Sequence, residues 1–349
     1  MTSSDAPILE LKGIGKSFKS KTSIADRLTG RGARVLRAVR DVSLTLHAGE
    51  TLGIVGESGC GKSTLGRCIT GFYEPDEGEV LYAGRPFLET GTRLERSRAI
   101  QMIFQDPYSS LNPRMTLAQA LDEVLLVHGL RKSTGERSNR VDELMDTVGL
   151  PPALKHRLPH ALSGGQRQRF SIARALAVEP RILVADEPVS ALDASVQAQI
   201  INLFVALRER LGLAYIFIAH DLNVVRYVSQ RIGVMYLGQV VELADADSIF
   251  EFPGHPYTRA LLSAIPEANP EHRRETASIE GDLPDPLSPP PGCSFSTRCP
   301  MAVEICRNTA PPARLIAGHA VRCHRGEEVA AMSKSMRSGE FGPHASRSS

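Results

Sequence analysis

The stretch GESGCGKST at residues 56–64 constrains the fold of this chain more than any other part of its sequence. It fits the pattern G-x-x-x-x-G-K-[ST], follows the apolar run TLGIV and precedes the helix-compatible run STLGRCITG. Glycines let backbone amides turn around a phosphate with no Cβ in the way, and the start of the next helix adds positive charge. The sequence therefore predicts a strand, a phosphate-binding loop and a helix, in this order.

The loop supplies a full set of candidate ligands for a nucleoside triphosphate. We expect Lys62 to reach the β- and γ-phosphates and the Ser63 hydroxyl to ligate Mg²⁺, with Thr64 next to the phosphates. A chance glycine-rich turn is the alternative, and the flanking strand and helix patterns argue against it. The candidate nucleotide-binding residues of this loop are Gly56, Glu57, Ser58, Gly59, Cys60, Gly61, Lys62, Ser63 and Thr64.

The stretch RILVADEP at residues 181–188 is an apolar run that ends in two adjacent acids. Two carboxylates at the end of a buried strand repel each other unless a cation lies beside them. Asp186 therefore suits Mg²⁺ coordination, and Glu187 suits polarisation of an attacking water. A strand end that faces solvent is the alternative, which the preceding phosphate-binding loop disfavours.

Apolar runs that alternate with helical patterns indicate an α/β core. RILVAD and AYIFIAH are bounded by turns or polar residues, as expected for parallel strands buried on both faces. Residues 8–18 predict an edge strand, and the basic, glycine-punctuated segment after them predicts an exposed loop or hairpin arm. Amphipathic spacing at about 113–165 predicts a helical subdomain inserted between core strands.

Composition and charge narrow the class of protein. The chain has 349 residues, and 41 basic against 39 acidic residues leave a formal charge of +2, which argues against a nucleic-acid-binding surface over the whole protein. No apolar run approaches the roughly 18 to 20 residues needed to cross a bilayer, and the amino terminus lacks the features of a signal peptide. We expect a cytoplasmic protein whose thiols are kept reduced.

The composition changes beyond residue 265. Proline and charged residues dominate the next segment and predict an extended linker, whereas the small, polar last stretch predicts a disordered tail. The expected boundaries are a core at 1–265, a cysteine-containing module at 266–325 and the tail at 326–349.

Four cysteines of this module have the spacing C-x5-C-x6-C-x16-C. In a reducing compartment such a cluster favours metal binding or thiol chemistry over structural disulfides. No gap is a C-x2-C hook, yet four thiolates satisfy either tetrahedral zinc or a [4Fe–4S] cluster. The spacing does not separate these two, and thiols without a metal are a third alternative. The four candidate ligands are Cys293, Cys299, Cys306 and Cys323, while Cys60 and Cys68 are expected to be packing residues.

The stretch LSGGQRQR at residues 162–169 is a second candidate phosphate-binding element, because Ser163 is a good N-cap and Gly164 and Gly165 leave amides open at the start of a helix. The stretch resembles the signature sequence of the ABC (ATP-binding cassette) ATPases, and the order of the motifs is similar to that family throughout. The resemblance implies an α/β fold: a P-loop NTPase core of the ABC ATPase type with an inserted helical subdomain, an antiparallel β subdomain and a small C-terminal cysteine-containing module.

The resemblance also implies roles for residues at a dimer interface. In this family the signature of one subunit, here Ser163 to Gln166, closes on the ATP held by the loop of another, so that hydrolysis requires a dimer of cassettes. Asp193 matches the residue that crosses this interface, and Phe18 matches the aromatic position that stacks on adenine. A lone phenylalanine is otherwise usually a core residue.

Two further positions match catalytic ones in the family. Gln105 matches the glutamine that senses the metal and the water and couples to membrane subunits, and His220 matches the switch histidine that contacts the γ-phosphate. Taken singly, a lone glutamine is usually a surface residue and a lone histidine a structural one. Their order and spacing favour a catalytic set of Glu187, His220 and Gln105, with Mg²⁺ held by Ser63, Gln105 and Asp186.

The stretches FQDPYSSLNPRMT and HPYTRALLSAIP resemble the oligopeptide and dipeptide importer ATPases, whose nickel-importing relatives share much of the pattern. The resemblance implies an ATP-hydrolysing subunit peripheral to the cytoplasmic face of the inner membrane. Its implied partners are a second, related ATPase subunit, two permeases contacted after Gln105 and through residues 113–160, and an extracytoplasmic binding protein. Similar C-terminal modules hold a [4Fe–4S] cluster, which favours that cluster over zinc. Nothing in the chain selects the solute.

Two rival functions belong to other classes. A soluble ABC ATPase that acts on ribosomes or nucleic acid typically carries two cassettes in one chain, and this sequence has one. An iron–sulfur redox protein that merely binds nucleotide does not need the complete hydrolytic set. We therefore expect a peptide-class importer subunit with no nucleic-acid partner.

Overall fold

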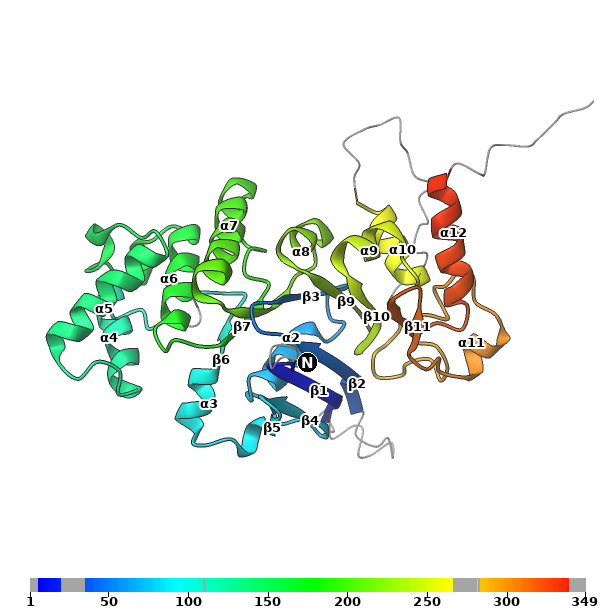
Figure 1. The fold of residues 1–349 in the computed structure, drawn as a ribbon, viewed down its shortest axis with the longest axis horizontal. Helices are drawn as coiled ribbons and strands as arrows, with labels where there is room; N and C mark the ends of the chain where they lie inside the picture. The colour runs from blue at the N-terminus through cyan, green and yellow to red at the C-terminus, as the bar shows by residue number, and fades with distance from the viewer. Residues whose placement is uncertain (1–5, 20–34, 109–110, 266–280, 282, 339–349) are drawn as a thin grey trace, which may run out of the picture. The chain divides into compact units, whose positions relative to one another are not determined.

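A computed structural model describes residues 6–19, 35–108, 111–265, 281 and 283–338 of the chain (Figure 1). These residues form two compact units, each described here by itself. The first unit comprises residues 1–16, 41–54 and 62–229, and the second comprises 17–40, 55–61 and 230–349. The predicted basic loop at 20–34 and most of the predicted linker, at 266–280 and 282, lie outside the described residues.

The core of the first unit is a run of parallel strands in the order β3-β8-β7-β6. Register is fixed by pairs such as Thr51 with Tyr215 and Ile182 with both Ala214 and Ile100. β-Branched and aromatic side chains dominate these strands, and β3, β7 and β8 are buried along their whole length, which confirms the predicted buried strands. Their bounds are β3 Thr51–Val55, β6 Ile100–Ile103, β7 Ile182–Asp186 and β8 Ala214–Ile218.

Helices cover both sides of these strands. In Figure 1, α7 (Ala194–Leu211) and α8 (Leu222–Val228) lie on one side and α2 (Lys62–Ile69) on the other. Gly66 lets α2 approach closely, because a Cβ there would lie 3.0 Å from Ile218 Cδ1 and 3.1 Å from Val184 Cγ1. The helix that starts at Lys62 is thus pressed against the strands that end at Asp186 and Ile218.

A second, antiparallel sheet has the order β2-β1-β4-β5. Its strands are β1 (Leu9–Lys19), β2 (Val35–Leu46), β4 (Glu77–Tyr82) and β5 (Arg85–Pro86). The strand predicted at residues 8–18 is therefore present, but its placement at a sheet edge is wrong, because β1 lies between β2 and β4. Leu9, Leu11 and Ile14 are buried, so one face of this strand packs in the core instead of facing solvent.

The predicted helical segment at about 113–165 contains α4 (Leu117–Val127) and α5 (Thr134–Thr147), and α6 (Gly164–Leu176) begins at its end. Each of the three helices starts with a capping box, in which a Ser or Thr hydroxyl and a Glu or Gln side chain satisfy amides reciprocally. Leu117, Leu121 and Leu125 are buried on one face of α4, as their helical spacing predicts. Upstream lie η1 (Phe87–Glu89) and α3 (Arg93–Ala99), and η2 (Pro152–Leu154) and η3 (Pro159–Ala161) precede α6.

The second unit is built on an antiparallel sheet in the order β11-β12-β10-β9. Glu242 on β10 is fully buried and accepts hydrogen bonds from the Gly254 and His255 amides at 2.7 and 3.0 Å and contacts His319 Nδ1 at 2.7 Å. Ser248 Oγ lies 2.6 Å from the other ring nitrogen of His319. The elements are β9 Arg231–Tyr236, β10 Gln239–Asp245, α9 Ala246–Glu251, α10 Pro256–Ser263, α11 Glu304–Asn308, β11 Arg314–Ile316, β12 His319–Val321 and α12 Gly326–Ser338.

The disordered tail predicted from residue 326 is wrong for residues 326–338, which form α12. Val329 is fully buried, and Ser333 Oγ donates a hydrogen bond to Pro253 O at 3.0 Å. A few apolar contacts and one buried hydroxyl therefore order a segment whose composition is small and polar. Residues 339–349 lie outside the described residues.

Candidate functional site

The parallel strands bring the predicted catalytic side chains together. Gln105 follows β6, Asp186 ends β7 and Glu187 follows it, and His220 follows β8. Since these strands are parallel neighbours, their carboxyl ends share one edge of the sheet, which is where ligands bind in folds of this kind.

Glu187 is the centre of this cluster. Its carboxylate Oε2 accepts a hydrogen bond from Gln105 Nε2 at 3.1 Å and lies 3.4 Å from His220 Nδ1. Its backbone has φ 46°, a strained conformation for a residue with a side chain, and it is held there by a 2.9 Å bond from its amide to Ile218 O. The side chain is 16% exposed and that of His220 is 60% exposed. The strained backbone thus fixes a carboxylate that solvent and a ligand can still reach.

Asp186 lies next to it in a more enclosed position. It is 3% exposed, and the Ser63 hydroxyl at the start of α2 donates a 2.8 Å hydrogen bond to its Oδ1. Burial raises the pKa of Asp186, the Ser63 bond opposes this, and the charge of Glu187 raises it further. A buried carboxylate of this kind, beside a hydroxyl and the 4%-exposed Lys62, is suited to a divalent cation and phosphate oxygens.

Residues 56–61 of the predicted phosphate-binding loop belong to the second unit, and Lys62 begins the first. A Cβ at Gly56 would lie 2.1 Å from Met235 O, and one at Gly61 would lie 2.1 Å from Ala38 O, so both positions require glycine. Ser58 and Gly59 between them are exposed, and a Cβ at Gly59 meets nothing within 4 Å. The ends of the loop are tightly packed while its middle is open to a ligand.

The predicted interface residues lie at helix starts. Ser163 caps α6 with Gln166, as predicted, and a Cβ at Gly165 would lie 2.5 Å from Val196 Cγ1. Asp193 caps α7: its Oδ1 accepts bonds from Ser195 Oγ at 2.7 Å and from the Val196 amide at 3.0 Å, and these two bonds lower its pKa. Phe18 is half-buried near the end of β1.

Sequence reasoning missed three side chains of the second unit. The Tyr257 hydroxyl accepts a 3.0 Å hydrogen bond from the Glu57 amide, and Arg298 contacts the Glu57 carboxylate beside Tyr236. Tyr257 lies in HPYTRALLSAIP, which served in the sequence only as a mark of the family resemblance, and no local pattern singles out Arg298 or Tyr236. The signal that could have found Arg298 is a lone arginine between two cysteines of an otherwise uncharged stretch.

The prediction of a [4Fe–4S] cluster at the four cysteines, or of zinc in its place, is wrong. Among the described residues no group of three or more His, Cys, Asp or Glu side chains is arranged to hold a metal ion. The cavity that the four thiols line has a volume of about 10 Å³, which admits at most one water. Burial raises the pKa of Cys293 to about 11 and that of Cys323 to about 12. All four are free thiols.

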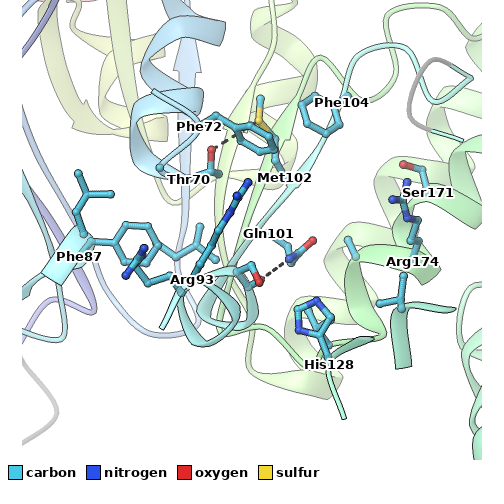
Figure 2. Close-up of a pocket in the computed structure, with 18 residues that line it drawn as sticks. Thr70, Phe72, Phe87, Arg93, Gln101, Met102, Phe104, His128, Ser171 and Arg174 are labelled. Carbon is cyan, nitrogen blue, oxygen red and sulfur yellow. Dashed lines mark hydrogen bonds between the residues drawn. The ribbon is translucent and has the colours of Figure 1, made fainter. Parts of the chain in front are cut away.

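The first unit also contains a pocket of about 450 Å³ (Figure 2). Figure 2 shows Phe72 near Phe104 at one end, and His128 and Arg174 across the pocket from Phe87. The rings of Phe72 and Phe104 meet edge to face at 5.6 Å, and Phe72 is 63% exposed. Phe104 directly precedes Gln105, whose side chain contacts Glu187. The pocket therefore adjoins the end of β6, next to this contact.

Comparisons with known proteins agree with this arrangement of motifs. Residues 39–190 match the family model described as ABC transporter, and residues 241–306 match the oligopeptide/dipeptide transporter C-terminal region. The chain is 47% identical to the oligopeptide transport ATP-binding protein AppF of Bacillus subtilis over 91% of this chain and 97% of that protein. The chain belongs to the ABC transporter family. The predicted α/β ABC cassette core and ATPase activity are confirmed.

Two more relatives define the family match. The di/tripeptide transport ATP-binding protein DppF of Pseudomonas aeruginosa is 48% identical over 85% of this chain and 93% of its own length. A dimeric structure of the ATP-binding cassette MJ0796 in a post-hydrolysis state with ADP and Pi superimposes with a TM-score of 0.59 at 30% identity, covering 68% of this chain and 98% of that one. No described helix of this ABC family member is long and apolar enough to cross a membrane.

Proposed function

We propose that this ABC protein is the ATP-hydrolysing subunit of an importer for di- or oligopeptides, at the cytoplasmic face of the inner membrane. The observation that carries the hydrolytic part is the convergence of Gln105 and His220 on the Glu187 carboxylate, beside the Ser63–Asp186 pair. The peptide part is supported by the match of residues 241–306 and by relatives named as oligopeptide and di/tripeptide transport proteins. These relatives favour peptide import over a soluble ATPase acting on ribosomes or nucleic acid.

The chain's own groups suggest how each acts in hydrolysis. Glu187 accepts a proton from, and orients, the attacking water, because its carboxylate is fixed by a strained backbone yet remains reachable. His220, which is more exposed, contacts the γ-phosphate, and Lys62 neutralises the phosphates. Ser63, Asp186 and Gln105 would hold Mg²⁺, which would neutralise charge on the transferred phosphoryl group. The loop amides of residues 56–64 bind the phosphates, with Phe18 against the adenine.

The signature residues suggest a second cassette as a partner. Ser163, Gly164 and Gly165 start α6, whose first amides make a phosphate-binding end, and Asp193 is exposed at the start of α7. Ser163 bonds to Gln166, and the Asp193 carboxylate bonds to Ser195 and Val196, so these side chains are engaged at their own helix starts. We therefore assign them to the nucleotide of a related, non-identical ATPase subunit.

The pocket of Figure 2 is the proposed contact with a permease. Its aromatic side chains, with Phe72 largely exposed, suit the apolar face of a short helix. Arg93, Arg96 and Arg174 suit an acidic residue on that helix. The pKa of His128 in this pocket is lowered by burial first and by the charge of Arg98 second. When a bound permease displaces Phe104, the neighbouring Gln105 moves with it and changes its contact with Glu187. This couples permease binding to ATP hydrolysis.

The test of hydrolysis is Glu187→Gln in the assembled complex. ATP binding is retained while steady-state hydrolysis falls at least about 100-fold, because the water loses its base and orienting group. Thr116→Ser, which keeps a hydroxyl cap far from the cluster, is the matched control. ATP hydrolysis at the wild-type rate by the Glu187→Gln complex would contradict the assignment of Glu187 as the base that orients the attacking water.

The test of import is reconstitution with permeases and binding protein in liposomes. ATP hydrolysis should rise on addition of the binding protein with di- or oligopeptide, and labelled peptide should accumulate on the side opposite the cassettes. Phe72→Asp should abolish permease co-purification, whereas Val127→Asp, at an equally exposed position outside the pocket, should not. Stimulation by nickel alone, or by ribosomes, contradicts the peptide assignment.

A further inference from the structure

Glu57 of the phosphate-binding loop is held by side chains from distant parts of the second unit. Arg298 Nη1 donates to both carboxylate oxygens of Glu57, at 3.1 and 2.9 Å, and Tyr257 accepts the Glu57 amide at 3.0 Å. The side chain of Arg298 is 9% exposed and that of Glu57 is 26% exposed. The ion pair is therefore mostly shielded from water, where a charge-assisted hydrogen bond contributes more than on an open surface.

An aromatic cluster orients these groups. The Tyr236 ring centroid lies 4.7 Å from that of Tyr257 and 5.3 Å from that of Phe295, and all three side chains are almost fully buried. The Arg298 guanidinium lies 6.0 Å from the Tyr236 ring centroid and 3.5 Å from its hydroxyl. Arg298 thus has little freedom to leave Glu57.

The segment that carries Phe295 and Arg298 is the one between Cys293 and Cys299. Ser294 Oγ in the same segment donates a 2.6 Å hydrogen bond to Gln239 Oε1, at the start of β10. The turn that precedes Gln239 also contacts the loop, since the Gly238 amide donates to Cys60 O at 2.8 Å. The loop residues Glu57 and Cys60 are therefore braced at two points by the same part of the second unit.

We infer that Arg298 is a positioning residue for nucleotide binding, through which the segment 293–299 fixes the conformation of loop 56–61. The loop amides bind phosphate best when they are already oriented, and Arg298 and Tyr257 fix Glu57, the residue at which the loop begins to turn. This inference rests on ATP binding by the loop and is independent of the transported solute and of any partner.

The first experiment measures ATP affinity in the full-length chain. Arg298→Gln should raise the Kd of a fluorescent ATP analogue about tenfold, the order expected for losing the shielded charge-assisted contact between Arg298 and Glu57. Arg298→Lys should recover part of this, because one ammonium can still reach Glu57. The exchange of Glu57→Arg with Arg298→Glu in one chain should bind better than either single variant.

The matched control is Arg314→Gln. Arg314 Nη2 donates to Cys323 O at 2.9 Å and His324 O at 3.2 Å, so it lies in the same part of the chain but bonds to the backbone there and not to Glu57. It should leave the Kd of the ATP analogue unchanged. An equal loss of affinity in both variants means that general loosening of the C-terminal region is responsible, and overturns the inference.

Hydrogen exchange supplies a second readout that does not depend on Arg298→Gln folding fully. By reciprocity, ATP should slow amide exchange in residues 293–299 of the wild-type chain. Glu57→Gln, which keeps the shape of the side chain and removes its charge, should reduce this ATP-dependent protection. Protection that is absent in the wild type, or undiminished in Glu57→Gln, contradicts the coupling.

Discussion

The hydrolytic cluster of the first unit and the buried network of the second differ in how their key residues are positioned. Gln105, Glu187 and His220 each lie within two residues of the end of a neighbouring parallel strand, so the pairing of these strands brings them together. Glu242 and His319 are 77 residues apart and meet only because β12 pairs with β10. Both clusters therefore depend on strand pairing over a long sequence separation, 82 residues for Gln105 and Glu187 and 77 for Glu242 and His319. They differ in that contiguous motifs mark the strand ends of the predicted catalytic cluster, whereas no local motif marks Glu242 or His319.

The largest effect expected from this comparison is a loss of activity without loss of fold. Asp186→Asn should lower ATP hydrolysis at least about 1,000-fold, because a neutral amide at this buried position is a poor ligand for Mg²⁺. The free energy of unfolding should change little, since Asn can still accept the Ser63 bond. Steady-state hydrolysis with a urea unfolding curve checks both, and a variant that hydrolyses ATP normally contradicts the assignment of Asp186.

In the second unit we expect a loss of stability rather than a loss of activity. Glu242→Ala should lower the free energy of unfolding by about 4 kcal/mol, because two backbone amides and His319 lose a fully buried acceptor. The urea unfolding transition should shift to lower urea concentration, while the protein that remains folded still binds ATP. Asp247→Ala, an exposed acid on α9, is the control. A shift no larger than that of the control would show that the network is not what holds this sheet.

The comparison explains what the sequence could and could not predict. The loop at 56–64, the buried strands and the acidic pair at 186–187 follow from local patterns, because each motif is contiguous. The roles of Gln105 and His220 follow only from the resemblance to the ABC ATPases. The placement of β1 between two strands depends on pairing, which alternation of side chains does not specify. The cysteine spacing suggested a metal, yet the cavity volume and the raised thiol pKa values depend on packing by residues distant in sequence. Arg298 meets Glu57 across 241 residues.

A pH dependence is expected from the second unit. His255 is 1% exposed, and burial lowers its pKa to about 4, against the opposing charge of Glu242. The unfolded chain binds a proton near pH 6.5 and the folded chain only near 4, so stability falls as the pH drops from 6.5 to 4, by about 3 kcal/mol in all. His255 Nδ1 accepts a hydrogen bond from the Tyr257 amide. An asparagine at position 255 keeps this helix cap but does not titrate. The difference in unfolding free energy between wild type and His255→Asn should therefore shrink toward low pH. A difference that stays constant from pH 7 to 4 would contradict the assignment of this pH dependence to His255.

The smallest effect concerns a helix cap in the first unit. Thr116→Ala should lower the free energy of unfolding by about 1 kcal/mol, because the Gln119 amide loses the hydroxyl that accepts its 3.3 Å hydrogen bond. Thr116→Ser, which keeps the hydroxyl, should be close to the wild type. Since α4 flanks the pocket of Figure 2 through Val124, Thr116→Ala should also weaken permease binding slightly while leaving ATP affinity of the isolated chain unchanged. An equal loss in ATP affinity would mean that the helical segment and the strand-end cluster are not separable.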